Sequence, residues 1–81
     1  MSRFQRREVV DAHFGLLDIE VAIVRAICEG RCAAGTGALV GLSEHTVRDY
    51  TKSIFTKMKV YGRVGMAIKA QRAGLLEGVE P

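Results

Sequence analysis

Five glycines divide this 81-residue chain into segments that each have the length of a short helix. They follow one another at intervals of 11 to 21 residues and are Gly15, Gly30, Gly41, Gly62 and Gly74. Glycine favours turns and helix ends, whereas proline, which breaks helices, occurs only at the last position. A chain of this size buries roughly 63% of the surface that it exposes when unfolded, enough for one small core and not for two domains. No β-alternation stands out, so the sequence predicts an all-α fold of four to five short helices.

Helical spacing of apolar residues is clearest in four segments. Residues 4–13 are expected to form a first helical piece. Asp18 is the expected N-cap of a second helix, in which apolar side chains recur up to Gly30. The strongest helix is expected to start at the N-cap Ser43, with an apolar stripe of Val47, Tyr50, Ile54, Phe55 and Met58. The last helix is expected over residues 63–73, with Gly74 as its C-cap and with Val64, Ala67, Ile68 and Leu75 facing the core.

Residues 32–41 predict only a weak helix. Gly35 and Gly37 each cost about 1 kcal/mol relative to alanine inside a helix. We therefore expect this segment to be the least stable helical piece. Replacing both glycines with alanine is expected to stabilise the fold, provided that neither adopts a positive φ.

Charge is strongly segregated along the chain. Residues 48–72 carry seven Lys and Arg side chains and a single carboxylate, Asp49, whereas residues 8–47 carry an excess of carboxylates. Such a basic block within regular secondary structure is typical of a protein that binds a polyanion. Arg3, Arg6 and Arg7 form a second basic cluster, either a DNA-contacting arm or, more simply, a frayed terminus.

The two cysteines do not indicate a secreted protein. Cys28 and Cys32 are too few for the disulfide framework of a small secreted domain, which favours a reducing, cytoplasmic location. A zinc site with His13 and His45 is the less favoured alternative, because the spacing repeats no zinc module. No apolar run is long enough to cross a membrane, and no signal peptide is recognisable. We expect neither a metal nor another cofactor.

A weak helix, a Gly-Leu-Ser turn and a strong helix with a cationic outer face are typical of a helix-turn-helix. The second helix of such a unit enters the major groove of DNA, where arginine and lysine reach guanine and neutralise phosphates. The helix start near Ser43 to Thr46 also favours a phosphate. No nucleophile with a base and an orienting group is recognisable, so the sequence does not favour an enzyme.

Residues 42–63 resemble the LuxR-type (GerE-like) helix-turn-helix of bacterial transcription regulators. That family reads approximately Leu-Ser-x-x-Thr-Val-Lys-x-His-x-x-x-Ile-x-x-Lys-Leu-x-Val-x-x-Arg, and this chain matches it closely in type and spacing. The resemblance covers roughly residues 16–73. It implies a four-helix domain over residues 16–75, preceded by a lead-in of residues 1–15 and followed by a tail of residues 76–81.

The resemblance also implies how individual residues contact double-stranded DNA. Arg48 stands where the family has a base-contacting lysine, Asp49 takes the next position, and Lys52 reaches bases or phosphate. Thr46 and Val47 lie at the helix start, near the DNA backbone. Tyr50 replaces a histidine and offers its hydroxyl to phosphate, and Lys57 matches a lysine near the helix end that we expect to contact phosphate. Glu20 matches a glutamate of the first helix and is expected to bond the turn that follows that helix.

The family dimerises through its last helix, which implies a homodimer on an inverted-repeat site. Met66, Ala70 and Ala73 are the small-residue seam expected at this interface. A full-length regulator and RNA polymerase are the further partners considered.

Two departures keep an alternative function open. The family usually has Ser-Asn-Lys-Glu-Ile-Ala where this chain has Cys-Ala-Ala-Gly-Thr-Gly, and Asp49 adds a negative charge to the expected DNA face. The alternative is a protein-interaction module of the same fold, an anti-activator that pairs with a full-length regulator and has reduced DNA affinity.

Overall fold

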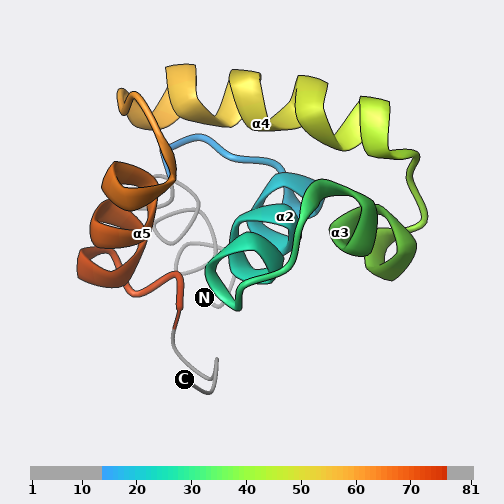
Figure 1. Ribbon diagram of the computed structural model, residues 1–81. Coiled ribbons are helices and arrows are strands. Elements are labelled where there is room, and N and C mark those ends of the chain that lie inside the picture. The colour runs from blue at the N-terminus through green and yellow to red at the C-terminus, as the bar shows by residue number, and fades with distance from the viewer. Residues whose placement is uncertain (1–13, 77–81) are drawn as a thin grey trace, which may run out of the picture.

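The computed structural model describes residues 14–76, which form four helices and no strand (Figure 1). The helices are α2 (Asp18–Cys28), α3 (Ala33–Val40), α4 (Glu44–Met58) and α5 (Arg63–Arg72). The prediction of an all-α fold is therefore confirmed. The helix expected at residues 4–13 and almost all of the expected lead-in and tail lie outside the described residues. None of the four helices combines the length and the apolar character needed to cross a membrane.

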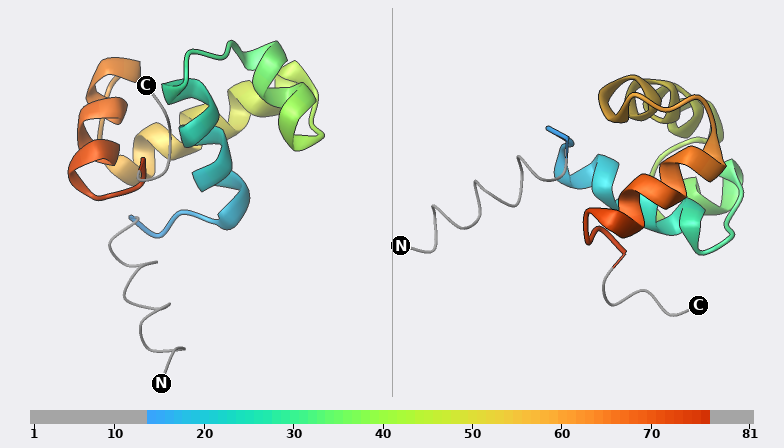
Figure 2. Two further views of the ribbon diagram at one scale, coloured as in Figure 1. Left: turned by 90° about the horizontal axis from the view of Figure 1, so that it is seen from below. Right: turned by 90° about the vertical axis from the view of Figure 1, so that its left-hand side faces the viewer.

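Helix α2 is the centre of the arrangement and packs against each of the other three helices. Helix α4 lies across one side of the molecule, with α3 beneath its first half and α5 beneath its last turns (Figures 1 and 2). Because its partners all lie on one side, α4 keeps its other side free along its length.

The core lies where α2, α4 and α5 meet. Its fully buried side chains include Ile23 and Val24 of α2 and Val47, Ile54 and Met58 of α4. The apolar stripe predicted for the strongest helix is thus the face that anchors α4, with Tyr50 and Phe55 partly buried at its margins.

The predicted orientation of the last helix is wrong. Met66 and Ala70, expected at a dimer seam, are 0% exposed, and Ala73 is half-buried. Val64 and Ile68, expected in the core, are 76% and 46% exposed. Both pairs are spaced i, i+4, so each forms one face of α5, and the sequence pattern does not distinguish them. The packing selects the face on which the long, flexible Met66 fills the core.

One predicted helix end holds and two are displaced by one residue. The Ser43 hydroxyl accepts a hydrogen bond from Thr46 N at 3.1 Å and caps α4. The C-cap of α5 is Ala73 and not the expected Gly74, which follows it in the left-handed region with φ +81°. The N-cap of α2, however, is Leu17, because the Glu20 carboxylate reaches back to accept from Leu17 N at 2.8 Å.

Helix α3 forms despite its glycines, and Gly37 has a reason to be there. The Gly37 carbonyl accepts from both Gly41 N and Leu42 N at 2.8 Å, which turns the chain toward α4. Gly41 completes this turn in the left-handed region, with φ +81°. A Cβ on Gly37 would lie 2.3 Å from the Leu42 carbonyl oxygen, so the expectation that alanine stabilises this position is wrong.

Candidate nucleic-acid interface

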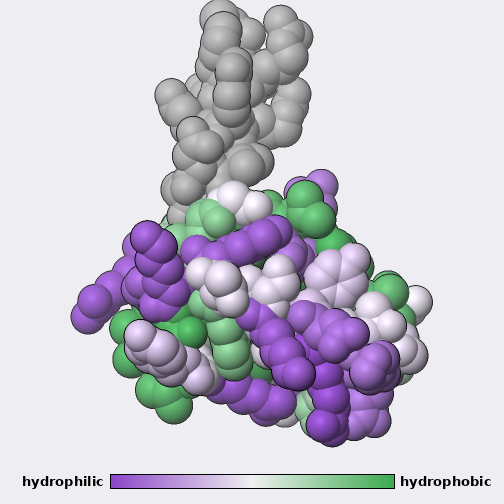
Figure 3. Space-filling view, turned by 90° about the horizontal axis from the view of Figure 1, so that it is seen from above, coloured by the Kyte–Doolittle hydropathy of each residue, from purple (hydrophilic) through white to green (hydrophobic). Residues whose placement is uncertain are grey.

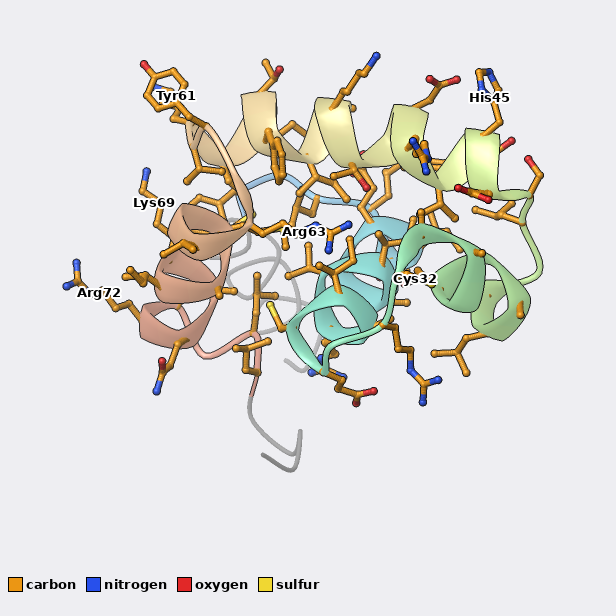
Figure 4. All side chains as sticks on the ribbon, in the orientation of Figure 1. Cys32, His45, Tyr61, Arg63, Lys69 and Arg72 are labelled. Carbon is orange, nitrogen blue, oxygen red and sulfur yellow. The ribbon has the colours of Figure 1, made fainter. Side chains whose placement is uncertain are left out.

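The free side of α4 is polar along its whole length. Viewed from above α4, hydrophilic side chains cover much of this face, and hydrophobic ones lie toward its edges (Figure 3). We call this surface the outer face of α4; its exposed residues are Glu44, His45, Arg48, Asp49, Lys52, Ser53 and Thr56. The side chain of His45 points away from the body of the molecule at the start of the helix (Figure 4).

Charges on the outer face are largely paired within the helix. Arg48 forms an ion pair with Glu44, and His45 lies 3.4 Å from the Asp49 carboxylate. Both pairs are spaced i, i+4, the separation at which helical side chains meet. Lys52 has no carboxylate within ion-pairing distance among residues 14–76. The outer face is therefore less cationic than the sequence of this segment indicates.

The structure separates the predicted DNA-contacting residues into accessible and inaccessible ones. Ser43, Arg48, Asp49 and Lys52 are exposed, and Thr46 and Tyr50 are half-buried. Val47 is 0% exposed and packs in the core, so its expected approach to the DNA backbone is wrong. Glu44 and His45 belong to the same accessible surface, although sequence reasoning gave them no part in it. Their positions one and two residues after the N-cap would have placed them there.

Lys57 is a structural residue, not a free surface cation. Its Nζ donates to Glu20 Oε1 at 2.8 Å, and Glu20 is only 2% exposed. The same oxygen accepts from Leu17 N, so Glu20 joins the start of α2 to the end of α4. The expected bond from Glu20 to the turn after its helix is therefore wrong, and the phosphate contact expected of Lys57 competes with a buried partner.

Another cation of the basic block also supports the fold. Lys69 Nζ donates to the Met58 carbonyl oxygen at 2.9 Å, where the last turn of α4 leaves carbonyls unpaired. The cations that the structure leaves available for a polyanion are therefore fewer than the seven counted in the sequence.

A groove runs beside the outer face of α4, between the start of α3 and the start of α5. Its volume is about 400 Å³, and the charged side chains that line it are Glu44, Arg48, Lys52 and Arg63. Figure 4 shows Arg63 reaching from α5 beneath α4 toward the part of the chain that contains Cys32. Sequence reasoning counted Arg63 in the basic block but missed its place in the site, although Arg63 matches the last arginine of the family pattern.

The two cysteines differ in environment. Partial burial raises the pKa of the Cys28 thiol, whereas a hydrogen bond from the Gly35 N–H lowers the pKa of the exposed Cys32 thiol. Both are free cysteines. Residues 14–76 contain no group of three or more His, Cys, Asp or Glu side chains placed to hold a metal ion, and His13 lies outside this range.

Comparisons of the chain with protein-family models, with curated proteins and with solved structures found no match. The function must therefore be inferred from the geometry of the chain's own side chains.

Proposed function

We propose that this protein is a sequence-specific regulator of transcription that binds double-stranded DNA, with α3 and α4 as a LuxR-type helix-turn-helix. One observation carries the proposal. The 15-residue α4 is anchored by a single apolar stripe, and its opposite face stays exposed and polar from Glu44 to Thr56. A short helix and a tight turn lead into it, as in helix-turn-helix units. Such a regulator acts in the bacterial cytoplasm and needs no cofactor.

The first half of the outer face has the chemistry for reading bases. An α-helix fits the major groove, and residues near its start point toward the base edges. Arg48 is suited to guanine O6 and N7, and Asp49 is suited to the cytosine amino group.

We place the contact of a homodimer on the outer side of α5. Val64 and Ile68 are exposed there, and Tyr61, in the turn before the helix, is fully exposed. Val64 and Ile68 are one helical turn apart, and Tyr61 precedes Val64 by three residues; we propose that these three side chains form the contact patch. We therefore expect two copies to associate when an inverted-repeat site holds them together.

The alternative function, a protein-interaction module, gains support from the paired charges of the outer face. The Glu44 carboxylate offsets the charge of Arg48, and Asp49 adds a negative charge beside His45, so the attraction to a polyanion is weaker than the net charge of +3 and the basic block indicate. In this alternative, the patch of Tyr61, Val64 and Ile68 would contact the last helix of a full-length regulator.

Selection from a random duplex pool, followed by fluorescence anisotropy titrations, tests the proposal. We expect an enriched inverted repeat and at least 1,000-fold tighter binding of the selected site than of a scrambled duplex. Log affinity should fall linearly with log salt concentration, since each phosphate contact releases counterions. If the protein binds no duplex even at low salt, or binds both duplexes equally, the proposed function is wrong.

A further inference from the structure

The groove beside α4 collects positive charge from two helices that are distant in sequence. Arg48 and Lys52 of α4 line one wall, and Arg63, the first residue of α5, lines the other. The turn after Met58 is what brings these residues together (Figure 4). Three cationic side chains therefore border a hollow that is open to solvent.

The charges in this groove are only partly compensated. Glu44 is the one carboxylate that lines it, and this carboxylate pairs with Arg48. Lys52 and Arg63 have no carboxylate within 4.0 Å among the described residues. The groove keeps a net positive charge, and a concave surface focuses such a field and attracts a counter-ion more strongly than a convex surface does.

The third wall of the groove has the same polarity. Ala33 and Ala34, in the first turn of α3, line the groove, and the N–H groups at a helix start carry partial positive charge. A hydrogen bond from the Gly35 N–H at this helix start lowers the pKa of Cys32, which also lines the groove.

We propose that this groove binds one backbone phosphate of the DNA, with Lys52 and Arg63 as its main ligands. The inference rests on the proposed function and deepens it, because it assigns a phosphate contact to a helix that follows the recognition helix. An arginine guanidinium can hold two phosphate oxygens at once, and Lys52 adds a point charge. A phosphate held here would fix how α4 lies in the major groove of the DNA. Arg48, which lines the protein groove, would then lie between this phosphate and the bases.

The test compares two arginines of α5 by making the same substitution in each. Arg63→Gln removes a groove cation, and Arg72→Gln removes an exposed cation at the other end of the helix and outside the groove lining. We expect Arg63→Gln to weaken binding of the selected duplex about tenfold and to reduce the salt slope by about 0.9. Arg72→Gln should change both much less. Circular dichroism and thermal unfolding verify that both variants fold.

Duplexes with one neutral methylphosphonate at each backbone position in turn then locate the contact. With the parent protein, one position per half-site should lose about tenfold in affinity, and with Arg63→Gln the same position should lose almost nothing. Bound duplex should also slow the reaction of iodoacetamide with Cys32 and leave that of Cys28 unchanged.

Each alternative result has a separate meaning. If Arg63→Gln and Arg72→Gln weaken binding equally, or if the methylphosphonate effect persists in Arg63→Gln, the groove holds no phosphate, while the proposed function stands. An unchanged reaction rate at Cys32 in the complex also overturns the groove proposal. If the parent protein binds no duplex at low salt, both proposals are overturned.

Discussion

Thr36, in α3, is fully buried. Its hydroxyl has no hydrogen-bond partner in the described part of the chain. A buried, unpaired hydroxyl costs free energy, because it has given up its bonds to water. We therefore expect Thr36→Val to raise the free energy of unfolding by about 1 kcal/mol. Thr36→Ser, which keeps the hydroxyl and loses the methyl group, should lower it by about 1 kcal/mol. Urea unfolding measures both, and a Thr36→Val protein that is less stable than the parent would mean that the hydroxyl has a partner.

Lys57 gives a second prediction for a single residue. Lys57→Ala leaves the Glu20 carboxylate buried without its ion pair, so we expect the free energy of unfolding to fall by about 2 kcal/mol. The exposed Lys52 is a control on the same helix, because Lys52→Ala should change the stability little.

The DNA affinity of the Lys57 variant separates the two interpretations of this residue. Measured well below the unfolding temperature, the salt slope of Lys57→Ala should equal that of the parent. If the variant has the stability of the parent and a salt slope reduced by about one unit, Lys57 contacts phosphate, as the sequence predicts.

Helix α3 contains two glycines, Gly35 and Gly37, and the sequence does not indicate which of them can be replaced. A Cβ on Gly35 would lie 3.7 Å from Cys32 Sγ, an ordinary contact, whereas one on Gly37 would meet the Leu42 carbonyl oxygen. We expect Gly35→Ala to stabilise the fold by up to about 1 kcal/mol and Gly37→Ala to destabilise it by about 1–3 kcal/mol. Thermal unfolding of the two single variants measures this difference. Equal shifts in the same direction would show that the turn after α3 does not approach Gly37 closely.

Local patterns made α4 the most predictable helix. Its N-cap, Ser43, and its stripe of Val47, Ile54 and Met58 are features of consecutive residues, so the sequence alone located both the helix and its buried face. The orientation of α5 was not predictable in this way. Of its two apolar i, i+4 pairs, the more hydrophobic one, Val64 and Ile68, is exposed, and Met66 and Ala70 are buried instead. Hydrophobic spacing within α5 therefore indicates the wrong face.

The candidate site was less predictable than the fold, because its charges depend on contacts between distant residues. Lys57 matches a DNA-contacting pattern but meets Glu20, 37 residues earlier in the chain. Arg63 joins the groove only because α5 folds back beneath α4. Conversely, the pairing of Glu44 with Arg48 and of His45 with Asp49 follows from the i, i+4 spacing and could have been predicted from the sequence.

On the scale of the whole molecule, the exposed patch on α5 predicts how two copies associate. Val64→Asp and Ile68→Asp should each abolish cooperative binding to an inverted repeat while leaving binding to a single half-site unchanged. Ala38→Asp on α3 is a control, because Ala38 is exposed at a site far from this patch. Sedimentation of the protein–DNA complex gives the number of bound copies. If two parental copies bind without cooperativity, the patch on α5 is not a dimer contact.

The central claim is that the outer face of α4 contacts DNA, and the most direct measurement is a nuclear magnetic resonance titration of the protein with the selected duplex. We expect the largest backbone amide shifts at exposed positions between Glu44 and Lys52, with smaller shifts at the start of α3 and at Arg63. Amides of the buried side of α2, such as Ile23, should shift least, since α2 lies beneath α4. Shifts that are concentrated around Val64 and Ile68 with none on α4, or no shifts at low salt, would contradict the claim.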